Sequence, residues 1–424
     1  MQHSSNVDCP TGIEELDALL DGGFPRGSVI LLKGDPGAGK TTFAAKFIYE
    51  GITKYGEPGI YISFAEPFDE FYRFMKLLGM DFNIDNFCYL EFHGFDEDLL
   101  ASNILEAIVD SNAMRVAIDS ITALTAQFGA RARLFLNTLN RKLKAIGTTS
   151  ILVSDTPSSH LEDFVADGVI NFKTDVENGL LTRRMEIRKL RGKCIRIAEI
   201  PFAVLPGKGL FLFPLCTAKP VRGLSSEVIK TGIPTIDRAI GGIPRTSLTL
   251  ITGVSGSGKT MLAAQMAANI SRELSVAYVS LEEPEEQVER KLAEFGAKDV
   301  MVVSLNPASV SSEEIFARIM GYNSDVFFID GLRLLRELRE ESRFWYCTVN
   351  SLVAIKNRGA TVIYTYAADY PLERISVDTL ADVLLLLRYD GTKRKLSIWK
   401  HRNLTAPNRE FDVRISGGRV EVMD

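Results

Sequence analysis

Short apolar runs alternate with longer amphipathic stretches through the first half of the chain. Four runs are almost continuously apolar and rich in β-branched residues, at 28–34, 59–64, 115–119 and 149–155. Four stretches instead repeat apolar residues at helical spacing, at 41–56, 69–79, 98–112 and 132–147. The first set predicts strands buried on both faces and the second predicts helices. Strands that alternate with helices in this way predict an α/β fold with a mostly parallel sheet between helices.

The pattern changes towards residue 213. Residues 181–192 and 199–214 are rich in strand-forming side chains and contain no helical stretch between them. We therefore expect antiparallel strands that continue the sheet at its C-terminal edge.

The same pattern then occurs a second time. The segment at 10–42 returns at 230–261, and RVAIDS at 115–120 returns as VFFIDG at 326–331. The phrase at 60–67, IYISFAEP, returns as AYVSLEEP, and KLRG at 189–192 returns as KHRN. A repeat of this length indicates a duplicated domain. We place the two domains at 1–223 and 224–424, joined by a Pro-, Gly- and Ser-containing connector at 214–228.

Composition narrows the class of protein. Hydrophobic residues make up 46% of the chain, charged residues 24%, and the net charge is −5. The five cysteines are far apart, which favours a reducing cytoplasm over a disulfide framework or a zinc site. The apolar runs are too short to span a bilayer, so we expect no membrane partner. Neither half has the basic excess of a dedicated nucleic-acid binder.

Two glycine-rich segments carry the clearest chemical signal. GDPGAGKT at 34–41 and GVSGSGKT at 253–260 each follow a predicted strand and precede a predicted helix. Backbone N–H groups of such a loop cradle phosphate oxygens, and its lysine reaches the β- and γ-phosphates. The predicted phosphate-binding residues are Gly34, Asp35, Pro36, Gly37, Ala38, Gly39, Lys40, Thr41 and Thr42, and Gly253, Val254, Ser255, Gly256, Ser257, Gly258, Lys259, Thr260 and Met261.

Magnesium ligands are expected beside each loop. Thr41 and Thr260 would offer a hydroxyl to Mg²⁺. Asp119 and Asp330 end apolar strands, where the second magnesium-orienting carboxylate of a phosphate-loop protein belongs.

Taken together, the motifs resemble the KaiC-like branch of the RecA superfamily. The similarity includes TGIEELD, YISFAEP and EIRKLRG in the first copy, and TGIPTID, YVSLEEP and WKHR in the second. It implies two tandem RecA-like domains, ATP with Mg²⁺ as ligand, hydrolysis of ATP, and assembly into homo-oligomeric, hexameric rings with nucleotide between neighbouring subunits. Protein partners are also expected.

The resemblance assigns further roles. Glu66 in the first copy, and Glu282 and Glu283 in the second, would orient the attacking water. The basic pairs Lys189 with Arg191 and Lys400 with Arg402 would reach across a subunit interface to the neighbour's γ-phosphate. The sequence departs from the family pattern at two places: Ala65 stands where the second copy has Glu282, and KHRN replaces the usual MRG or LRG.

Three interpretations remain open. The chain is a ring-forming ATPase switch, a nucleotide-gated scaffold with little turnover, or a DNA-engaging recombinase-like protein. The last depends on arginines at 122–133 and 332–343, but three glutamates accompany those of the second segment, which is more typical of a solvated helix. The autophosphorylated Ser–Thr pair of the family aligns with Asp378 and Thr379, which leaves only Thr379 as a candidate acceptor. A clock function is not inferred.

One aromatic cluster has a structural explanation. Phe68, Phe71, Phe74 and Met75 fall at helical spacing, which predicts a core-facing stripe.

Overall fold

The computed structural model describes residues 8–92, 97–156, 163–177, 179–195, 197–213, 223–337, 341–368, 379–402 and 409–424. The chain divides into two compact units, Met1–Phe213 and Pro214–Asp424. Most of the expected connector, 214–222, lies outside the described residues.

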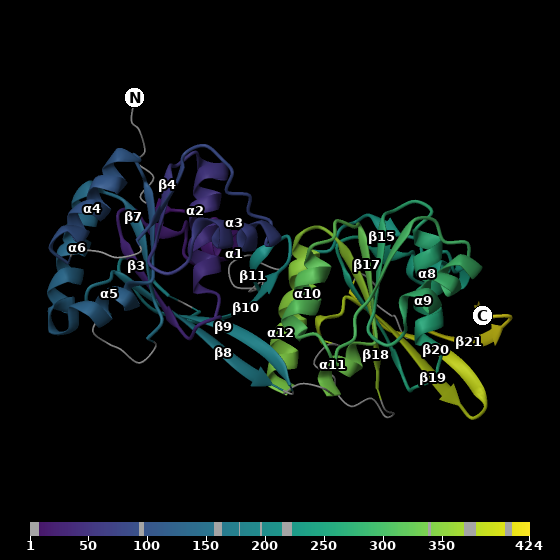
Figure 1. Ribbon diagram of the computed structural model, residues 1–424. Helices are drawn as coiled ribbons and strands as arrows, with labels where there is room; N and C mark the ends of the chain where they lie inside the picture. The colour runs from purple at the N-terminus through teal and green to yellow at the C-terminus, as the bar shows by residue number, and fades with distance from the viewer. Residues whose placement is uncertain are drawn as a thin grey trace. The chain divides into compact units, whose positions relative to one another are not determined.

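The first unit is built on a nine-stranded sheet (Figure 1). Strands β8, β3, β7, β6, β4 and β5 are parallel neighbours in that order, and β9, β10 and β11 continue the sheet antiparallel beyond β8. The strands are β3 (Val29–Gly34), β4 (Gly59–Ser63), β5 (Phe87–Glu91), β6 (Arg115–Asp119), β7 (Thr149–Ser154), β8 (Gly168–Glu177), β9 (Leu180–Leu190), β10 (Glu199–Leu205) and β11 (Gly209–Leu212). A separate two-stranded sheet pairs β1 (Asp8–Cys9) with β2 (Phe24–Pro25).

Helices lie on both faces of this sheet (Figure 1). They are α1 (Glu14–Leu19), α2 (Lys40–Tyr55), α3 (Phe68–Leu77), α4 (Glu97–Asp110), α5 (Ile121–Phe128) and α6 (Ala132–Ile146). Helices α4 to α6 pack against Val29 and Leu31 of β3, while Ile30 and Leu32 point to the other face and are equally buried. This two-sided burial explains why the parallel strands are continuously apolar.

The second unit repeats the arrangement strand for strand. Its sheet runs β16, β15, β17, β18, β14, β19, β20, β21, β22, which is the order of the first sheet read from β5 to β11. The strands are β14 (Leu248–Gly253), β15 (Val276–Ser280), β16 (Val300–Ser304), β17 (Val326–Asp330), β18 (Thr361–Ala367), β19 (Val383–Asp390), β20 (Lys393–His401), β21 (Arg409–Ser416) and β22 (Arg419–Met423), and β12 (Val228–Ile229) pairs with β13 (Ile243–Pro244). The helices are α7 (Pro234–Ile240), α8 (Lys259–Ile270), α9 (Glu285–Glu294), α10 (Ser312–Met320), α11 (Leu332–Glu337) and α12 (Glu341–Asn357). The duplicated α/β fold expected from the sequence is confirmed.

The aromatic stripe on α3 is only partly core-facing. Phe71 and Met75 are fully buried, whereas Phe74 is 44% exposed. The prediction for Phe74 is therefore wrong. Its ring lines a cavity beside α3 and does not pack into the core.

No helix in the described part of the chain is both long and apolar enough to cross a membrane.

Candidate functional site

Each glycine-rich loop connects the end of a central strand to the start of a helix. In the first unit the loop leaves β3 at Gly34, and α2 begins at Lys40 after Gly39, whose φ is 106°. Gly34 has φ 149°, and a β-carbon there would collide with the carbonyl oxygen of Phe172. The second loop repeats this at Gly253, where a β-carbon would collide with the carbonyl oxygen of Leu387. Only glycine fits these positions, so the loop backbone can curl around a ligand at the helix N-terminus.

The two loop lysines lie inside their loops. Lys40 is 4% exposed, and its Nζ donates to the carbonyl oxygens of Gly34 (2.7 Å) and Asp35 (2.8 Å). Lys259 Nζ donates to the carbonyl oxygen of Val254 (2.8 Å), and burial lowers the pKa of this lysine. An ammonium group at a glycine-rich loop suits the oxygens of a phosphate chain.

The hydroxyl and carboxylate expected to hold Mg²⁺ are in contact in the first unit. Thr41 Oγ1 donates to Asp119 Oδ2 (2.7 Å), which also accepts from the Tyr61 hydroxyl (2.6 Å). A hydroxyl that donates to a carboxylate keeps its lone pairs for a metal, and Mg²⁺ prefers such oxygen ligands together with phosphate and water. The residues therefore fit a magnesium-bound triphosphate, in which the ion neutralises phosphate charge.

The second unit has the same threonine–aspartate pair, and one oxygen of its carboxylate is unpaired among the described residues. Thr260 Oγ1 lies 3.3 Å from Asp330 Oδ1, and Asp330 Oδ2 is buried without a hydrogen-bond partner among the described residues. Burial raises the pKa of both Asp330 and Asp119 above the ordinary value. A bound cation would relieve the desolvation of both carboxylates.

The glutamates that follow the second strand differ between the units. Glu283 is held by Lys291 of α9, whose Nζ contacts both carboxylate oxygens. The side chain of its neighbour Glu282 lies against Gly331, the residue after Asp330. Burial and the charge of Asp330 raise the pKa of Glu282, and Lys259 opposes the shift. In the first unit Ala65 stands at the Glu282 position, and Phe74 occupies the place of Lys291.

Glu66 lines a cavity of about 400 Å³ together with Lys40, Thr41 and Asp119. Burial, and then the charge of Asp119, raises the pKa of the Glu66 carboxyl. The first unit therefore brings its loop lysine, magnesium ligands and acidic residue to one cavity.

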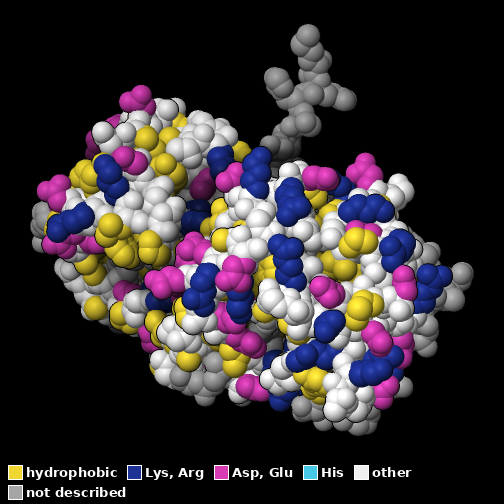
Figure 2. Space-filling model, turned by 90° about the vertical axis from the view of Figure 1, so that its right-hand side faces the viewer, with side chains coloured by type: hydrophobic (Ala, Val, Ile, Leu, Met, Phe, Trp, Pro, Cys, Tyr) yellow, Lys and Arg dark blue, Asp and Glu magenta, His cyan; other side chains and the backbone are white. Residues whose placement is uncertain are grey.

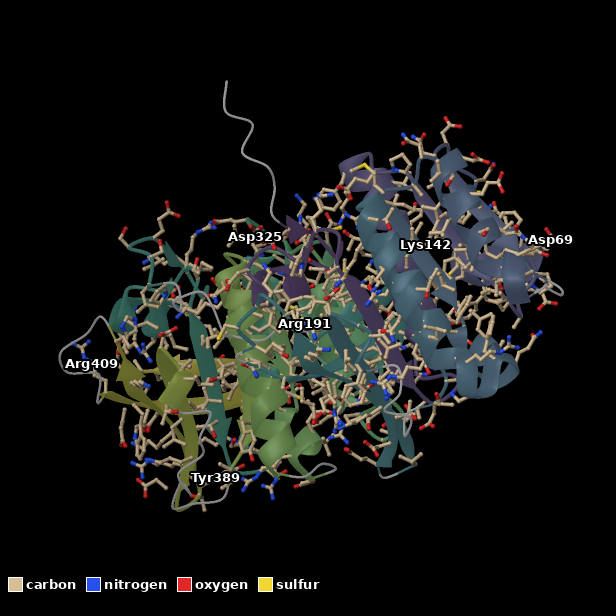
Figure 3. All side chains as sticks on the ribbon, turned by 90° about the vertical axis from the view of Figure 1, so that its left-hand side faces the viewer. Asp69, Lys142, Arg191, Asp325, Tyr389 and Arg409 are labelled. Carbon is tan, nitrogen blue, oxygen red and sulfur yellow. The ribbon has the colours of Figure 1, made fainter. Side chains whose placement is uncertain are left out.

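The cavity also contains residues that sequence reasoning missed. Asp155, Arg183 and Phe74 line it beside the loop. In the second unit the Tyr389 hydroxyl, labelled in Figure 3, donates to the carbonyl oxygen of Gly256 (3.1 Å). Asp155 ends the SILVSD run at the same sheet edge as Asp119, a position that could have drawn attention to it.

The basic pair of the first unit lies at the opposite edge of the sheet. Leu190, between Lys189 and Arg191, pairs with Gly168, which pairs with Ile30 near the start of β3. The phosphate loop leaves the other end of that strand, about 13 Å further on at a rise of roughly 3.3 Å per residue. Lys189 Nζ donates to the carbonyl oxygens of Asp163 (3.0 Å) and Ala166 (2.6 Å). The Arg191 side chain (Figure 3) is 64% exposed, with Nη1 3.7 Å from Asp167 Oδ1.

The second pair occupies the corresponding edge. Lys400 Nζ and Arg402 Nη2 lie 3.1 Å and 3.4 Å from the carbonyl oxygen of Thr379. Arg402 Nε is also 3.2 Å from Asp382 Oδ1. Thr379 itself therefore lies away from the phosphate loop of its own unit, and Asp378 lies outside the described residues.

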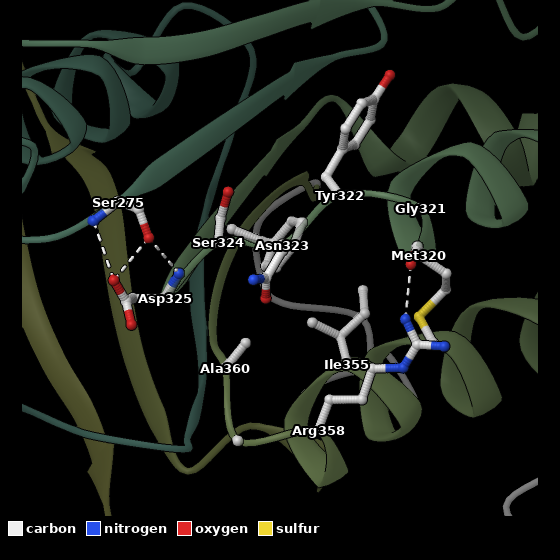
Figure 4. A pocket seen from close by; sticks show the side chains of 12 residues that line it. Ser275, Met320, Gly321, Tyr322, Asn323, Ser324, Asp325, Ile355, Arg358 and Ala360 are labelled. Atoms are coloured by element: carbon white, nitrogen blue, oxygen red, sulfur yellow. Dashed lines mark hydrogen bonds between the residues drawn. The ribbon is translucent and has the colours of Figure 1, made fainter.

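A larger cavity, about 550 Å³, opens at the N-terminal ends of β15 and β17 (Figure 4). Two of its polar groups are engaged with other lining residues: Ser275 Oγ donates to Asp325 Oδ2 (2.6 Å), and Arg358 Nη1 donates to the carbonyl oxygen of Met320 (2.6 Å). It has no glycine-rich loop and lies at the edge away from Lys259. The nucleotide chemistry therefore belongs to the phosphate-loop edge.

Comparison with known proteins agrees with this geometry. A family model described as "ATPase: KaiC" matches residues 9–215 and 229–302, which include both phosphate loops. The circadian clock oscillator protein KaiC of Prochlorococcus marinus (strain MIT 9313) is 29% identical over 470 aligned residues, covering 100% of this chain and 94% of that protein. The KaiC proteins of Thermostichus vulcanus and Synechococcus elongatus are 28% and 27% identical, over 92% and 93% of this chain and 83% and 84% of their own lengths. Since the family match covers more than half of the chain, this protein belongs to the KaiC family of RecA-like ATPases, which bind ATP with Mg²⁺ and hydrolyse it.

Proposed function

We propose that this ATPase is a conformational switch that works as a homo-oligomeric ring in the cytoplasm. The ring is expected to be hexameric, with each nucleotide between two neighbouring copies. Its state, set by ATP binding and hydrolysis, would be passed on to a protein partner.

The position of Lys189 and Arg191 carries this proposal. Both residues lie at the sheet edge away from the phosphate loop of their own unit, so they cannot serve the nucleotide bound there. Arg191 is largely exposed, as a group that reaches into another subunit must be. A cation supplied by a neighbour stabilises the charge that develops on the transferred phosphoryl group, and it makes turnover depend on assembly.

We assign the water-orienting carboxylate differently in the two units. Glu66 takes this role in the first unit because it lines the cavity with Lys40 and Asp119. Glu282 takes it in the second, since Glu283 is held by Lys291.

Mixing two inactive variants tests the shared site. One carries Lys40→Ala, so it holds no nucleotide in its first unit but keeps its basic pair. The other carries Arg191→Ala, so it holds nucleotide but supplies no cation. Both also carry Lys259→Ala, which confines phosphate release to the first unit.

Each variant alone should lose about a thousandfold in phosphate release. The mixture should recover release far above the sum of the two, because some sites combine an intact loop with an intact basic pair. Light scattering with ATP and Mg²⁺ should show a mass increase for the wild type. Mixed oligomers that form without regaining activity would contradict the proposal.

A further inference from the structure

Two positions beside the phosphate loop hold residues of different charge in the two units. Strand β7 lies next to β3, and Lys33 of β3 pairs with Ser154 of β7. Asp155 follows Ser154 and therefore lies opposite Gly34. In the second unit the residue opposite Gly253 is Ala367. Three residues after the magnesium aspartate, the first unit has Thr122 and the second has Arg333. The pair Thr122 and Asp155 thus adds a negative charge, whereas Arg333 and Ala367 add a positive one.

In the first unit the acidic residue contacts the loop lysine. Asp155 Oδ1 lies 2.9 Å from Lys40 Nζ, and its side chain is 35% exposed. The backbone N–H of Asp155 donates to Thr122 Oγ1 (2.8 Å), which fixes the strand end at this place. Asp155 also raises the pKa of Asp119 through its charge, so the two carboxylates are close enough to repel. Asp119 and Asp155 thus place two acidic groups near Lys40, in a cavity that Arg183 also lines.

In the second unit the guanidinium group of Arg333 lies at the corresponding place beside the loop. Arg333 Nη1 lies 3.4 Å from the carbonyl oxygen of Ala367, the residue paired with the first glycine of the loop. Arg333 Nε lies 2.7 Å from Glu337 Oε1, one turn further along α11. The charge of Arg333 contributes to the lowered pKa of Lys259, after burial, which is the first cause. Arg333 therefore lies beside the phosphate loop, close enough to Lys259 for the two charges to interact.

We propose that Arg333 binds the terminal phosphate of ATP from within the second unit, and that Asp155 makes ATP binding in the first unit depend strictly on Mg²⁺. Arg333 exchanges its contact with Glu337 for a phosphate oxygen, because a guanidinium–phosphate contact is stronger than an exposed ion pair. The second unit then retains nucleotide when the metal is withdrawn. In the first unit Asp155 and Asp119 repel a metal-free triphosphate, and Mg²⁺ removes that repulsion.

The test measures binding and requires neither turnover nor a ring, so its failure is separate from that of the proposed switch. The probe is N-methylanthraniloyl-ATP, followed by fluorescence anisotropy in excess Mg²⁺ and in EDTA. Full-length Lys40→Ala reports the second unit, and full-length Lys259→Ala reports the first. EDTA should weaken binding to the first unit at least roughly tenfold more than binding to the second.

Substitutions at Arg333 and Asp155 should change how strongly ATP binding in each unit depends on Mg²⁺. Arg333→Thr, the residue of the first unit, should weaken EDTA binding in the Lys40→Ala chain by roughly ten- to hundredfold. Arg336→Thr on the same helix is the matched control, because Arg336 Nη1 donates to the Tyr366 hydroxyl (3.0 Å). It should leave binding unchanged. Asp155→Ala should strengthen EDTA binding in the Lys259→Ala chain by about tenfold.

Equal metal dependence of the two units would overturn the proposal. So would an unchanged Arg333→Thr variant that melts like its parent. If Arg333→Thr does not fold, the Asp155→Ala arm decides alone: unchanged EDTA binding there rejects the proposal.

Discussion

The acidic pair after the second strand of each unit has diverged at one residue. The second unit keeps Glu282 and Glu283, whereas the first has Ala65 and Glu66. In the second unit the Lys291 ammonium group contacts both carboxylate oxygens of Glu283, whereas Asp330 and Lys259 are the charges that act on Glu282. Phe74 replaces Lys291 in the first unit, so Glu66 has no such clamp and can serve its cavity. This difference is the reason for our proposal that the water-orienting carboxylate comes from adjacent positions in the two units.

Glu66→Gln should lower phosphate release from the first unit by at least about a hundredfold, the usual effect of removing a general base. The measurement uses Lys259→Ala chains at saturating ATP and Mg²⁺. In the Lys40→Ala chain, Glu282→Gln should have the same effect. Glu283→Gln should change release less than about threefold, since its carboxylate is engaged with Lys291.

The pH profile provides a second readout. The base form of Glu66 is lost as pH falls through its pKa, and burial and Asp119 place that pKa above the ordinary value. Release from the first unit should therefore fall on the acid side at a higher pH than an ordinary glutamate would give. The residual activity of Glu66→Gln should lack this limb. An identical limb in both proteins would remove Glu66 from the mechanism.

Residues inside the phosphate-loop motif could be predicted because the motif fixes their spacing. Arg183 and Arg333 could not, since they come from distant segments that the sheet brings to the loop. Asp155 is intermediate, because it ends a predicted strand at the same sheet edge as Asp119. Phe74 was assigned to the core because helical spacing describes a face of the helix but not what covers that face.

At the scale of helices and strands, a buried ion pair connects the C-terminal end of α12 to the sheet. Lys356 Nζ lies 2.8 Å from Asp382 Oδ2, with side chains 3% and 1% exposed. The same oxygen accepts from the backbone N–H of Leu248 at the start of β14 (2.8 Å). One carboxylate thus connects a helix, the central strand and the segment before β19. No sequence pattern predicted this contact, because the three segments are far apart in the chain.

Lys356→Met should lower the free energy of unfolding of the second unit by about 3 kcal/mol, because it removes the buried ammonium partner of Asp382 and leaves this carboxylate only the half-exposed Arg402. Tryptophan fluorescence in a urea titration reports this unit selectively, since both tryptophans, Trp345 and Trp399, belong to it. Lys395→Met is the control: Lys395 pairs with Asp412 at the surface (2.8 Å), so its loss should change the free energy of unfolding far less. Equal losses would contradict a special role for Lys356.

The alternation of strands and helices could be predicted because burial on both faces makes parallel strands continuously apolar. The edge strands β5 and β16 were not predicted, since partly exposed strands such as Phe87–Glu91 carry a weaker pattern. The segment at 122–133, considered as a DNA-binding loop, is instead mostly helical, within α5 and α6.

For the whole molecule, the remaining question is whether DNA controls the ATPase. The net charge is −5, and on the face in Figure 2 the Lys and Arg side chains are interspersed with Asp and Glu. Two of the arginines that motivated the DNA interpretation have partners: Arg333 contacts Glu337, and Arg133 lies over the ring of Phe164 at 5.7 Å. Phosphate binding by DNA proteins needs cations that can displace condensed counterions.

Single-stranded DNA at physiological salt should therefore leave phosphate release by the wild type within about twofold of the DNA-free rate. The comparison is made at several salt concentrations, because electrostatic binding would strengthen steeply as salt is lowered. Arg131→Ala and Arg336→Ala should behave like the wild type in the same assay. Stimulation that grows at low salt, and is lost in these variants, would instead favour a recombinase-like protein and would make assembly on DNA, rather than a free ring, the state that hydrolyses ATP.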